Sequence, residues 1–282
     1  MSNKLLREIK LYYAGTILFS WSVFGLLGFL GKTDSPLILL GIWGPTIVAL
    51  TLTYKIYGKV GVRIFLKRFS TWKIGALWFI YLFAGFLIIG YLGMFLWSVI
   101  NSSTFEFWYP SINKIIFVTL FQIIIIGMGE EFGWRGFALQ RLQYLSTPLK
   151  ATLILAFMHL LWHAPTYWLG QGMHNVPVIW AMLYVLPWTI LFTWVYNRTN
   201  GSILVAVLFH GVHGATLSIV SFLPWESVVP LSPKLITSIW LSKEIFGPYV
   251  VIVGLYWILA LLVISGKFGG LGKPPKFEHQ KV

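Results

Sequence analysis

The stretch Ile123-Ile-Ile-Ile-Gly-Met-Gly-Glu-Glu-Phe-Gly-Trp-Arg135 places two adjacent carboxylates directly after a long run of apolar residues. The apolar run, near residues 112–130, is long enough for a helix that crosses the roughly 30 Å hydrocarbon core of a bilayer. An ionisable side chain at such a place costs free energy, so its presence indicates function. The stretch therefore predicts a membrane protein with polar chemistry at the end of a spanning helix.

The composition of the whole chain agrees with this prediction. Of 282 residues, 57% are hydrophobic and 10% are charged, and the mean hydropathy is +0.79. A soluble domain carries about 25% charged residues, and a globular core of this size cannot hide so much apolar surface. These values exclude a water-soluble enzyme, a disordered chain and a nucleic-acid-binding domain. The chain has no cysteine, which excludes disulfides, thiolate metal sites and a cysteine nucleophile.

Further apolar runs predict an all-α fold with about eight transmembrane helices. The runs lie near residues 11–30, 36–54, 74–100, 112–130, 149–168, 177–196, 202–223 and 247–265. Tryptophan and tyrosine recur near their ends, as expected of rings at the membrane interface. No sizeable extramembrane domain and no internal repeat is evident, so we expect a single transmembrane domain over residues 1–282.

The basic residues predict that both termini face the cytoplasm. With this orientation, all of the 21 Lys and Arg residues lie on the cytoplasmic side except Lys32, Lys114, Lys234 and Lys243, as the positive-inside rule requires. The net charge of +13 is then explained by membrane lipids as partners, without a nucleic acid. We expect a multi-pass protein of a cell membrane, most simply a prokaryotic plasma membrane.

Ionisable residues inside the expected helices are few. Of the eight carboxylates, only Glu130 and Glu131 directly follow a spanning run, and we expect the others in tails or loops: Glu8, Asp34, Glu106, Glu226, Glu244 and Glu278. Four of the six histidines form two close pairs inside spans, His159 with His163 and His210 with His213. The other two, His174 and His279, are expected in a loop and in the tail.

Helical spacing predicts what these residues can do. Residues four apart share a face, so Glu131 and Arg135 can form an ion pair, while Glu130 points about 100° away. The histidines of each pair also share a face. Three helices can thus direct one carboxylate and two or more imidazoles into one polar pocket. The structural alternative is an interfacial ion-pair cluster with interhelical hydrogen bonds.

Such a pocket suits peptide hydrolysis. A partly desolvated carboxylate can act as a general base, an imidazole can help to hold the water, and a second imidazole can donate to an oxyanion. Glu130, His163 and His210 would take these three roles. A divalent metal is an open alternative, because His-x-x-x-His on a helix is a zinc spacing. Its candidate ligands are His159, His163, His210 and His213, although no Glu follows the first histidine as in zincins.

At these residues the sequence resembles the CAAX protease and bacteriocin-processing family of intramembrane proteases. The first family motif, Glu-Glu-x-x-x-Arg, matches Glu130 to Arg135. The second, a histidine in a Trp-His-x-Pro context, matches Trp162-His163-Ala-Pro165. The third, a histidine in a late apolar helix, matches His210. The resemblance covers roughly residues 115–220, the expected core protease region.

The resemblance implies a glutamate-dependent intramembrane endopeptidase. The first-motif Glu and the second-motif His then activate water, and the third-motif His supports the oxyanion, which assigns these roles to Glu130, His163 and His210. Supporting residues would be Glu131, Arg135, His159 and His213. No cofactor is expected, with a divalent metal left open. The implied substrates are CAAX-type lipidated proteins or other membrane-associated peptides, cut near the cytoplasmic leaflet.

Two departures from the family pattern keep other functions open. His159 stands where the second motif usually has Phe, and Gly214 stands where the third motif usually has Asn or Asp. Glycine supplies no side-chain donor. A non-catalytic relative of the bacteriocin-immunity type therefore remains an alternative. So does a small proton-coupled transporter that uses Glu130 and the histidines as a relay.

The predicted depths of the site residues disagree with one another. At about 1.5 Å per residue, Glu130 lies near the cytoplasmic edge, His210 about 12 Å deep and His163 roughly 20 Å deep. A fourth helix that continues beyond Arg135 would place Glu130 deeper and remove the disagreement.

Overall fold

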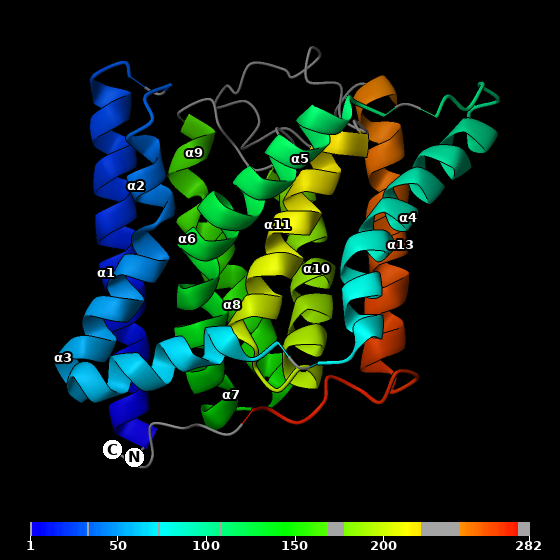
Figure 1. Cartoon of the computed structure of the whole chain (residues 1–282). Helices are drawn as coiled ribbons and strands as arrows, with labels where there is room; N and C mark the ends of the chain where they lie inside the picture. The colour runs from blue at the N-terminus through cyan, green and yellow to red at the C-terminus, as the bar shows by residue number, and fades with distance from the viewer. Residues whose placement is uncertain are drawn as a thin grey trace.

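The computed structural model describes residues 2–32, 34–72, 74–107, 109–168, 178–220 and 243–275. Over these residues the regular structure is entirely helical, which confirms the predicted all-α class (Figure 1). The elements in chain order are α1 (Ser2–Phe29), α2 (Ile38–Ile42), α3 (Gly44–Lys67), η1 (Arg68–Ser70), α4 (Ala76–Ile100), α5 (Ile112–Phe121), η2 (Gln122–Gly127), α6 (Met128–Glu131), η3 (Phe132–Leu139), α7 (Gln140–Leu145), α8 (Pro148–Trp162), α9 (Ala164–Trp168), α10 (Val178–Arg198), α11 (Ile203–Val220) and α13 (Lys243–Ile264).

Among the described residues, six helices are long and apolar enough to cross a membrane. They are Ser2–Phe29, Ala76–Ile100, Ile112–Leu145, Val178–Arg198, Ile203–Val220 and Gly247–Ile264. The chain is therefore a multi-pass membrane protein, but the expected count of eight is not confirmed. The other two predicted spans correspond to α3 and α8, which are helical. Helix α8 has 15 residues and reaches only about 22 Å, less than the thickness of the hydrocarbon core.

Helix α3 fails as a uniform span because it bends at Gly58. This glycine has a φ of 65°, in the left-handed region that glycine adopts without steric cost. The part of α3 after the bend runs across the lower part of the bundle in Figure 1. It carries Lys59, Arg63 and Lys67, a composition that suits a helix lying at a membrane surface.

The helix that carries the two adjacent carboxylates is longer than predicted. It runs without a break from Ile112 to Leu145, 34 residues, whereas the hydropathy pattern predicted an end near residue 130. Residues 129–143 are all buried, because neighbouring helices surround this polar half of the helix. Glu130 therefore lies well inside the bundle, and the disagreement between the predicted depths disappears.

Two segments of this long helix, η2 and η3, are π-helical. A π-helical turn is wider than an α-helical one and is often found at functional sites. The single turn α6, which contains Glu130 and Glu131, lies between the two π-helical segments. The directions in which these carboxylates point are thus set by an unusual local backbone.

Glycines allow α11 to pack closely against η2. A Cβ atom added to Gly127 would lie 2.6 Å from the carbonyl oxygen of Val207, and one added to Gly211 would lie 2.5 Å from Ile123 Cα. Small residues at helix contacts let backbones approach closely inside a membrane. This approach brings His210, the neighbour of Gly211, against the helix that carries Glu131.

Helix α1 is held to the long helix by an ion pair that the sequence analysis did not foresee. Glu8, expected in a tail, is 3% exposed within α1, and its Oε2 lies 2.8 Å from Nε of Arg141. The hydroxyl of Tyr57 donates to the other carboxylate oxygen at 2.8 Å. The prediction for Glu8 was wrong because its cationic partner is 133 residues away.

The other predicted loop carboxylates have mixed outcomes. Asp34 and Glu106 lie outside the helices, as expected. Glu244 lies in the first turn of α13, so its assignment to a loop was wrong. Glu226 and Glu278, like His174 and His279, lie outside the described residues.

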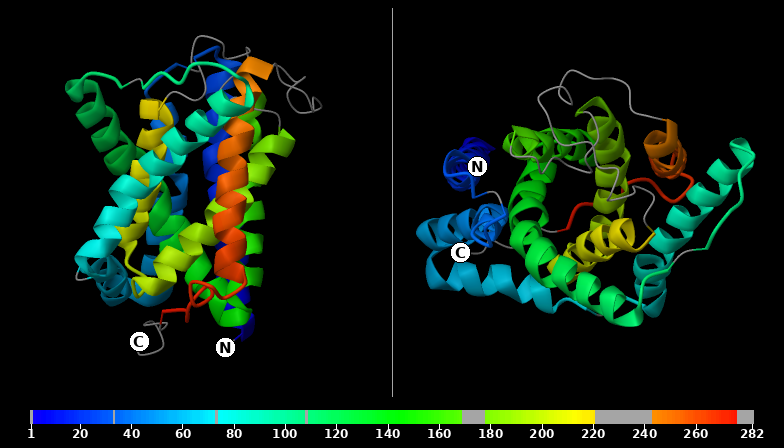
Figure 2. Two further views of the ribbon diagram at one scale, coloured as in Figure 1. Left: turned by 90° about the vertical axis from the view of Figure 1, so that its right-hand side faces the viewer. Right: turned by 90° about the horizontal axis from the view of Figure 1, so that it is seen from above.

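The start of the first helix and the end of the last described helix lie close to one end of the bundle. Helix α1 begins and helix α13 ends at the same end of the molecule, the lower end in Figure 1. Helices α1 and α3 lie on one side of the bundle, and α4 and α13 lie on the other (Figure 2). Helix α11 lies between these two sides of the bundle, where it packs against η2, α4 and α10.

Candidate active site

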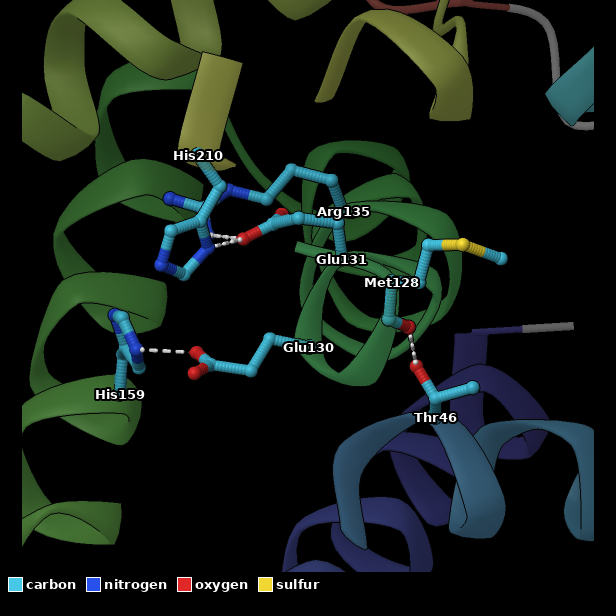
Figure 3. Close-up of polar contacts among 7 residues, drawn as sticks. All are labelled: Thr46, Met128, Glu130, Glu131, Arg135, His159 and His210. Carbon is cyan, nitrogen blue, oxygen red and sulfur yellow. Dashed lines mark hydrogen bonds and ion pairs between the residues drawn. The ribbon is translucent and has the colours of Figure 1, made fainter. Parts of the chain in front are cut away.

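The two adjacent carboxylates point to different partners. Glu130 is 3% exposed and Glu131 is fully buried. Oε2 of Glu130 lies 3.0 Å from Nε2 of His159 on α8 (Figure 3). Oε1 of Glu131 accepts from Arg135 at 2.9 Å and lies 2.6 Å from Nδ1 of His210 on α11. The predicted ion pair between Glu131 and Arg135 is confirmed.

Arg135 is held on its other side by aromatic rings of α10. Its Cζ lies 3.7 Å from the centre of the Phe192 ring and 5.0 Å from that of Trp188. A guanidinium over an aromatic face is attracted by the ring quadrupole. The rings and the carboxylate together fix the guanidinium, which in turn fixes the carboxylate of Glu131.

The contact with Glu131 defines the protonation of His210. An ionised carboxylate only accepts hydrogen bonds, so Nδ1 of His210 carries a hydrogen. The remaining nitrogen, Nε2, becomes a second donor when the ring is an imidazolium, a form that the adjacent carboxylate stabilises. Glu131 can thus hold His210 as a cationic donor that faces the site.

Helix α8 carries His159 and ends directly before His163, and both histidines lie near Glu130. His159 makes the direct contact, and the ring centre of His163, one helical turn later, lies 4.9 Å from that of His159. A donor nitrogen of His163 lies within 4.8 Å of both the Glu130 carboxylate and His159. The sequence analysis placed His163 next to the base and gave His159 a supporting role. The structure adds that His159 is the residue that touches the carboxylate.

One of the two ring nitrogens of His159 does not contact Glu130. Its Nε2–H donates to Glu130, which leaves Nδ1 as an acceptor in the neutral ring. Among the residues that the structure describes, none hydrogen-bonds this buried Nδ1 or Oε2 of Glu131. Buried polar atoms are seldom left without a partner, so both atoms are suited to a bound water or a substrate group.

His213 lies outside this group of residues. It contacts the hydroxyl of Tyr184 through a hydrogen bond, and its ring centre lies 5.3 Å from that of Trp188 and 6.1 Å from that of Tyr256. These contacts direct it toward α10 and α13. The three-residue spacing from His210 placed it on a similar face, but the packing of α10 decides its direction.

Two sets of residues have the donor atoms for a metal ion. They are Glu130 with His159 and His163, and Glu130 with Glu131 and His210, and the ligand atoms within each set lie within 4.8 Å of one another. Two histidines and a glutamate form a donor set used by zinc. Of the four histidines considered as ligands, His213 belongs to neither set in the described part of the chain.

The sequence analysis missed a residue of α3 that supports the site. The hydroxyl of Thr46 donates to the carbonyl oxygen of Met128 at 2.8 Å, two residues before Glu130 (Figure 3). A Cβ on Gly133 would lie 2.5 Å from the carbonyl oxygen of Pro45, so the start of α3 packs directly on the long helix. The sequence motif Gly-Pro-Thr indicates only the start of a helix, and nothing in it points to Met128.

The fold and this geometry define the class of the protein: a multi-pass membrane protein with a buried site of two glutamates, an arginine and histidines from three helices. Residues 110–216 match the Rce1-like family, described as type II CAAX prenyl endopeptidase Rce1-like. This match lies in the region that carries the three predicted motifs, and the predicted resemblance to a family of CAAX proteases is confirmed.

A curated relative carries a related name. CAAX prenyl protease 2 of Methanococcus maripaludis is 30% identical over 98 residues, which are 32% of this chain and 36% of the relative. The match thus spans about a third of the relative's length. It supports the family of the core region and leaves the activity of the whole chain to be proposed from its site.

Proposed function

We propose that the protein is an intramembrane endopeptidase in which Glu130 activates a water molecule for attack on a peptide bond. The observation that carries this proposal is the buried carboxylate of Glu130, held by His159 at 3.0 Å and flanked by His163 and His210. A carboxylate among imidazoles inside a membrane span is costly unless it is used. Its region matches a family of proteases.

The proposed reaction begins with a water molecule between Glu130 and His163. The carboxylate oxygen that does not face His159 takes a proton from the water as the oxygen attacks the carbonyl carbon. His163 orients the water, and His159 holds the carboxylate of Glu130 through Nε2. The carbonyl oxygen becomes an oxyanion, which accepts a hydrogen bond from Nε2 of the His210 imidazolium. As the C–N bond breaks, Glu130 returns its proton to the leaving amine.

Glu131 and Arg135 act as positioning residues in this scheme. Glu131 holds His210 through a 2.6 Å contact, and Arg135 holds Glu131. Because Phe192 and Trp188 pack against both Arg135 and His210, the donor is fixed before the substrate arrives. Such preorganisation is the main source of electrostatic stabilisation in acyl-transfer sites.

We further propose that both termini lie on the cytoplasmic side and that the chain crosses the membrane eight times. The first half of α3 together with α2, and α8 together with α9, would complete the two remaining crossings with a break in each. The common end of α1 and α13 supports an even number (Figure 1). Because the chain lacks cysteine, the single variants Lys10→Cys and Ser102→Cys can be labelled with a maleimide that does not cross the membrane. In intact cells, we expect the maleimide to label Ser102→Cys and not Lys10→Cys.

The proposed substrate is a CAAX-type lipidated peptide that enters from the cytoplasmic leaflet. The family description supports this class of substrate. A farnesylated CAAX reporter peptide incubated with the purified protein in detergent tests it. We expect release of the terminal tripeptide by the wild-type protein.

The variant Glu130→Gln tests the role of the base, since an amide has the same shape and cannot take a proton. We expect its rate to fall at least about 100-fold, the scale of general base catalysis. Glu106→Gln is the matched control, because Glu106 is exposed outside the helices. Cleavage by Glu130→Gln at the wild-type rate would contradict the proposal. Cellular function retained by Glu130→Gln would select the non-catalytic relative, and proton-driven uptake by proteoliposomes would select the transporter.

A further inference from the structure

The side chain of Gln122 occupies the space next to Gly214. A Cβ atom added to Gly214 would lie 2.5 Å from Oε1 of Gln122 and 2.9 Å from its Cδ. A side chain at position 214 and the amide of Gln122 therefore exclude each other. Gly214 lies four residues after His210 on α11, so it shares the helix face of that histidine.

Gln122 is the polar residue of an otherwise apolar segment. It follows Phe121 and precedes four isoleucines, Ile123 to Ile126, inside the helix that crosses the membrane. A primary amide placed in such a segment costs free energy unless it is hydrogen-bonded. Among the described residues, no hydrogen bond involves the side-chain amide of Gln122. Its two donors and its acceptor are thus available to a ligand.

The backbone turns Gln122 toward the site. Gln122 precedes Glu130 by eight residues. In an ideal α-helix these eight residues rotate by two full turns plus about 80°, which would point the Gln122 side chain away from the face of Glu130. Here the π-helical segment η2 begins at Gln122 and ends at Gly127. Its wider turns reduce this excess, which brings Gln122 closer to the face of the long helix that carries Glu130.

The spacing of His210 and Gly214 along α11 allows the His210 ring and the amide beside Gly214 to share one acceptor. Residues 210 and 214 are about 6 Å apart along the axis of α11. Two N–H groups that each lie about 2.9 Å from one oxygen can be almost 6 Å apart. A tetrahedral intermediate beside His210 can therefore place its oxygen between the His210 ring and the amide that lies against Gly214.

We propose that the Gln122 side-chain amide is the second donor to the oxyanion, in the place of the side chain that Gly214 lacks. This assignment rests on the proposed peptidase function. It makes Gln122 and Gly214 a complementary pair: the glycine is needed because the amide enters from the neighbouring helix.

The test uses two substitutions of Gln122 and a swap. Gln122→Met keeps the length of the side chain and removes the donor, whereas Gln122→Ala also removes its volume. For both, we expect kcat for the farnesylated reporter to fall about 100-fold with KM nearly unchanged, as when one oxyanion donor is removed. Gly214→Asn alone should be impaired, because its side chain collides with Gln122. The double variant Gln122→Ala/Gly214→Asn should recover at least about tenfold over Gln122→Ala.

A peptide ketone that hydrates to a tetrahedral diol gives an independent measurement. Its inhibition constant should weaken in Gln122→Met by the same factor as kcat/KM, because both depend on stabilisation of the tetrahedral state. A kcat for Gln122→Met within about threefold of the wild type overturns the role of Gln122 and leaves the peptidase intact. A loss confined to KM, or a double variant no better than Gln122→Ala, also overturns it. No cleavage by the wild-type protein overturns both proposals.

Discussion

A methyl group added to Gly211 is expected to separate two helices that the site needs in contact. The Cβ of Gly211→Ala would lie 2.5 Å from Ile123 Cα and 2.7 Å from its backbone nitrogen. Carbon atoms in normal contact are about 3.5 Å apart or more, and backbone atoms cannot turn aside as a flexible side chain can. Helix α11 must therefore retreat by about 1 Å from η2.

That retreat acts on both stability and activity. Overpacking of this kind costs about 1–3 kcal/mol, and the better helix propensity of alanine returns up to about 1 kcal/mol. The 2.6 Å contact between His210 and Glu131 would stretch to about 3.6 Å, beyond hydrogen-bond range. A misplacement of about 1 Å in a catalytic group lowers the rate about 100-fold.

The assay is cleavage of the farnesylated reporter, together with thermal unfolding of the purified protein in detergent. Gly254→Ala in α13 is the matched control, because no atom lies within 4 Å of a Cβ at that position. We expect the control to keep wild-type activity and an equal or higher melting temperature. Gly211→Ala should lose about two orders of magnitude in rate while it loses at most about 3 kcal/mol in stability. Wild-type activity in Gly211→Ala would refute the dependence of His210 on this helix contact.

Two further predictions concern a buried ion pair and metal ions. Arg141→Met removes the cation beside the buried Glu8 and should destabilise the protein by about 3–5 kcal/mol. The control is Lys10→Met, on an exposed face of α1. We expect Arg141→Met to melt at a lower temperature than this control, and equal melting temperatures would contradict the prediction. Added Zn²⁺ should inhibit cleavage by binding Glu130, His159 and His163, and a chelator should restore it. His159→Phe removes one ligand and should raise the inhibitory zinc concentration, so inhibition that is identical in His159→Phe would show that zinc binds elsewhere.

The residues of the site were predictable where local spacing determines them. The ion pair of Glu131 with Arg135 follows from four-residue spacing, and Glu130 was expected to point elsewhere, as it does. The partner of Glu130 was less predictable. The four-residue spacing of His159 and His163 predicts that they share one helix face, and only the packing of the helices decides that His159 makes the contact.

The elements that sequence analysis missed depend on contacts between distant segments. Hydropathy ended the fourth span near Glu130 because the following residues are polar, yet neighbouring helices bury them. The pairing of Glu8 with Arg141 spans 133 residues. The bend of α3 arises from the backbone conformation of Gly58, and Gln122 lies in the space that the missing side chain of Gly214 leaves open. Composition and periodicity reveal neither.

The central claim is that Glu130 acts on water as a base and does not itself attack the peptide. A single-turnover cleavage in water enriched in ¹⁸O, with enzyme in excess over the farnesylated reporter, tests this claim directly. If water attacks the carbonyl carbon, the new carboxylate of the product carries ¹⁸O in the first turnover, and Glu130→Gln forms product at least about 100-fold more slowly. If the Glu130 carboxylate attacks as a nucleophile and water then cleaves the resulting anhydride at the glutamyl carbon, the ¹⁶O of Glu130 enters the product. An unlabelled product in the first turnover would therefore contradict the account.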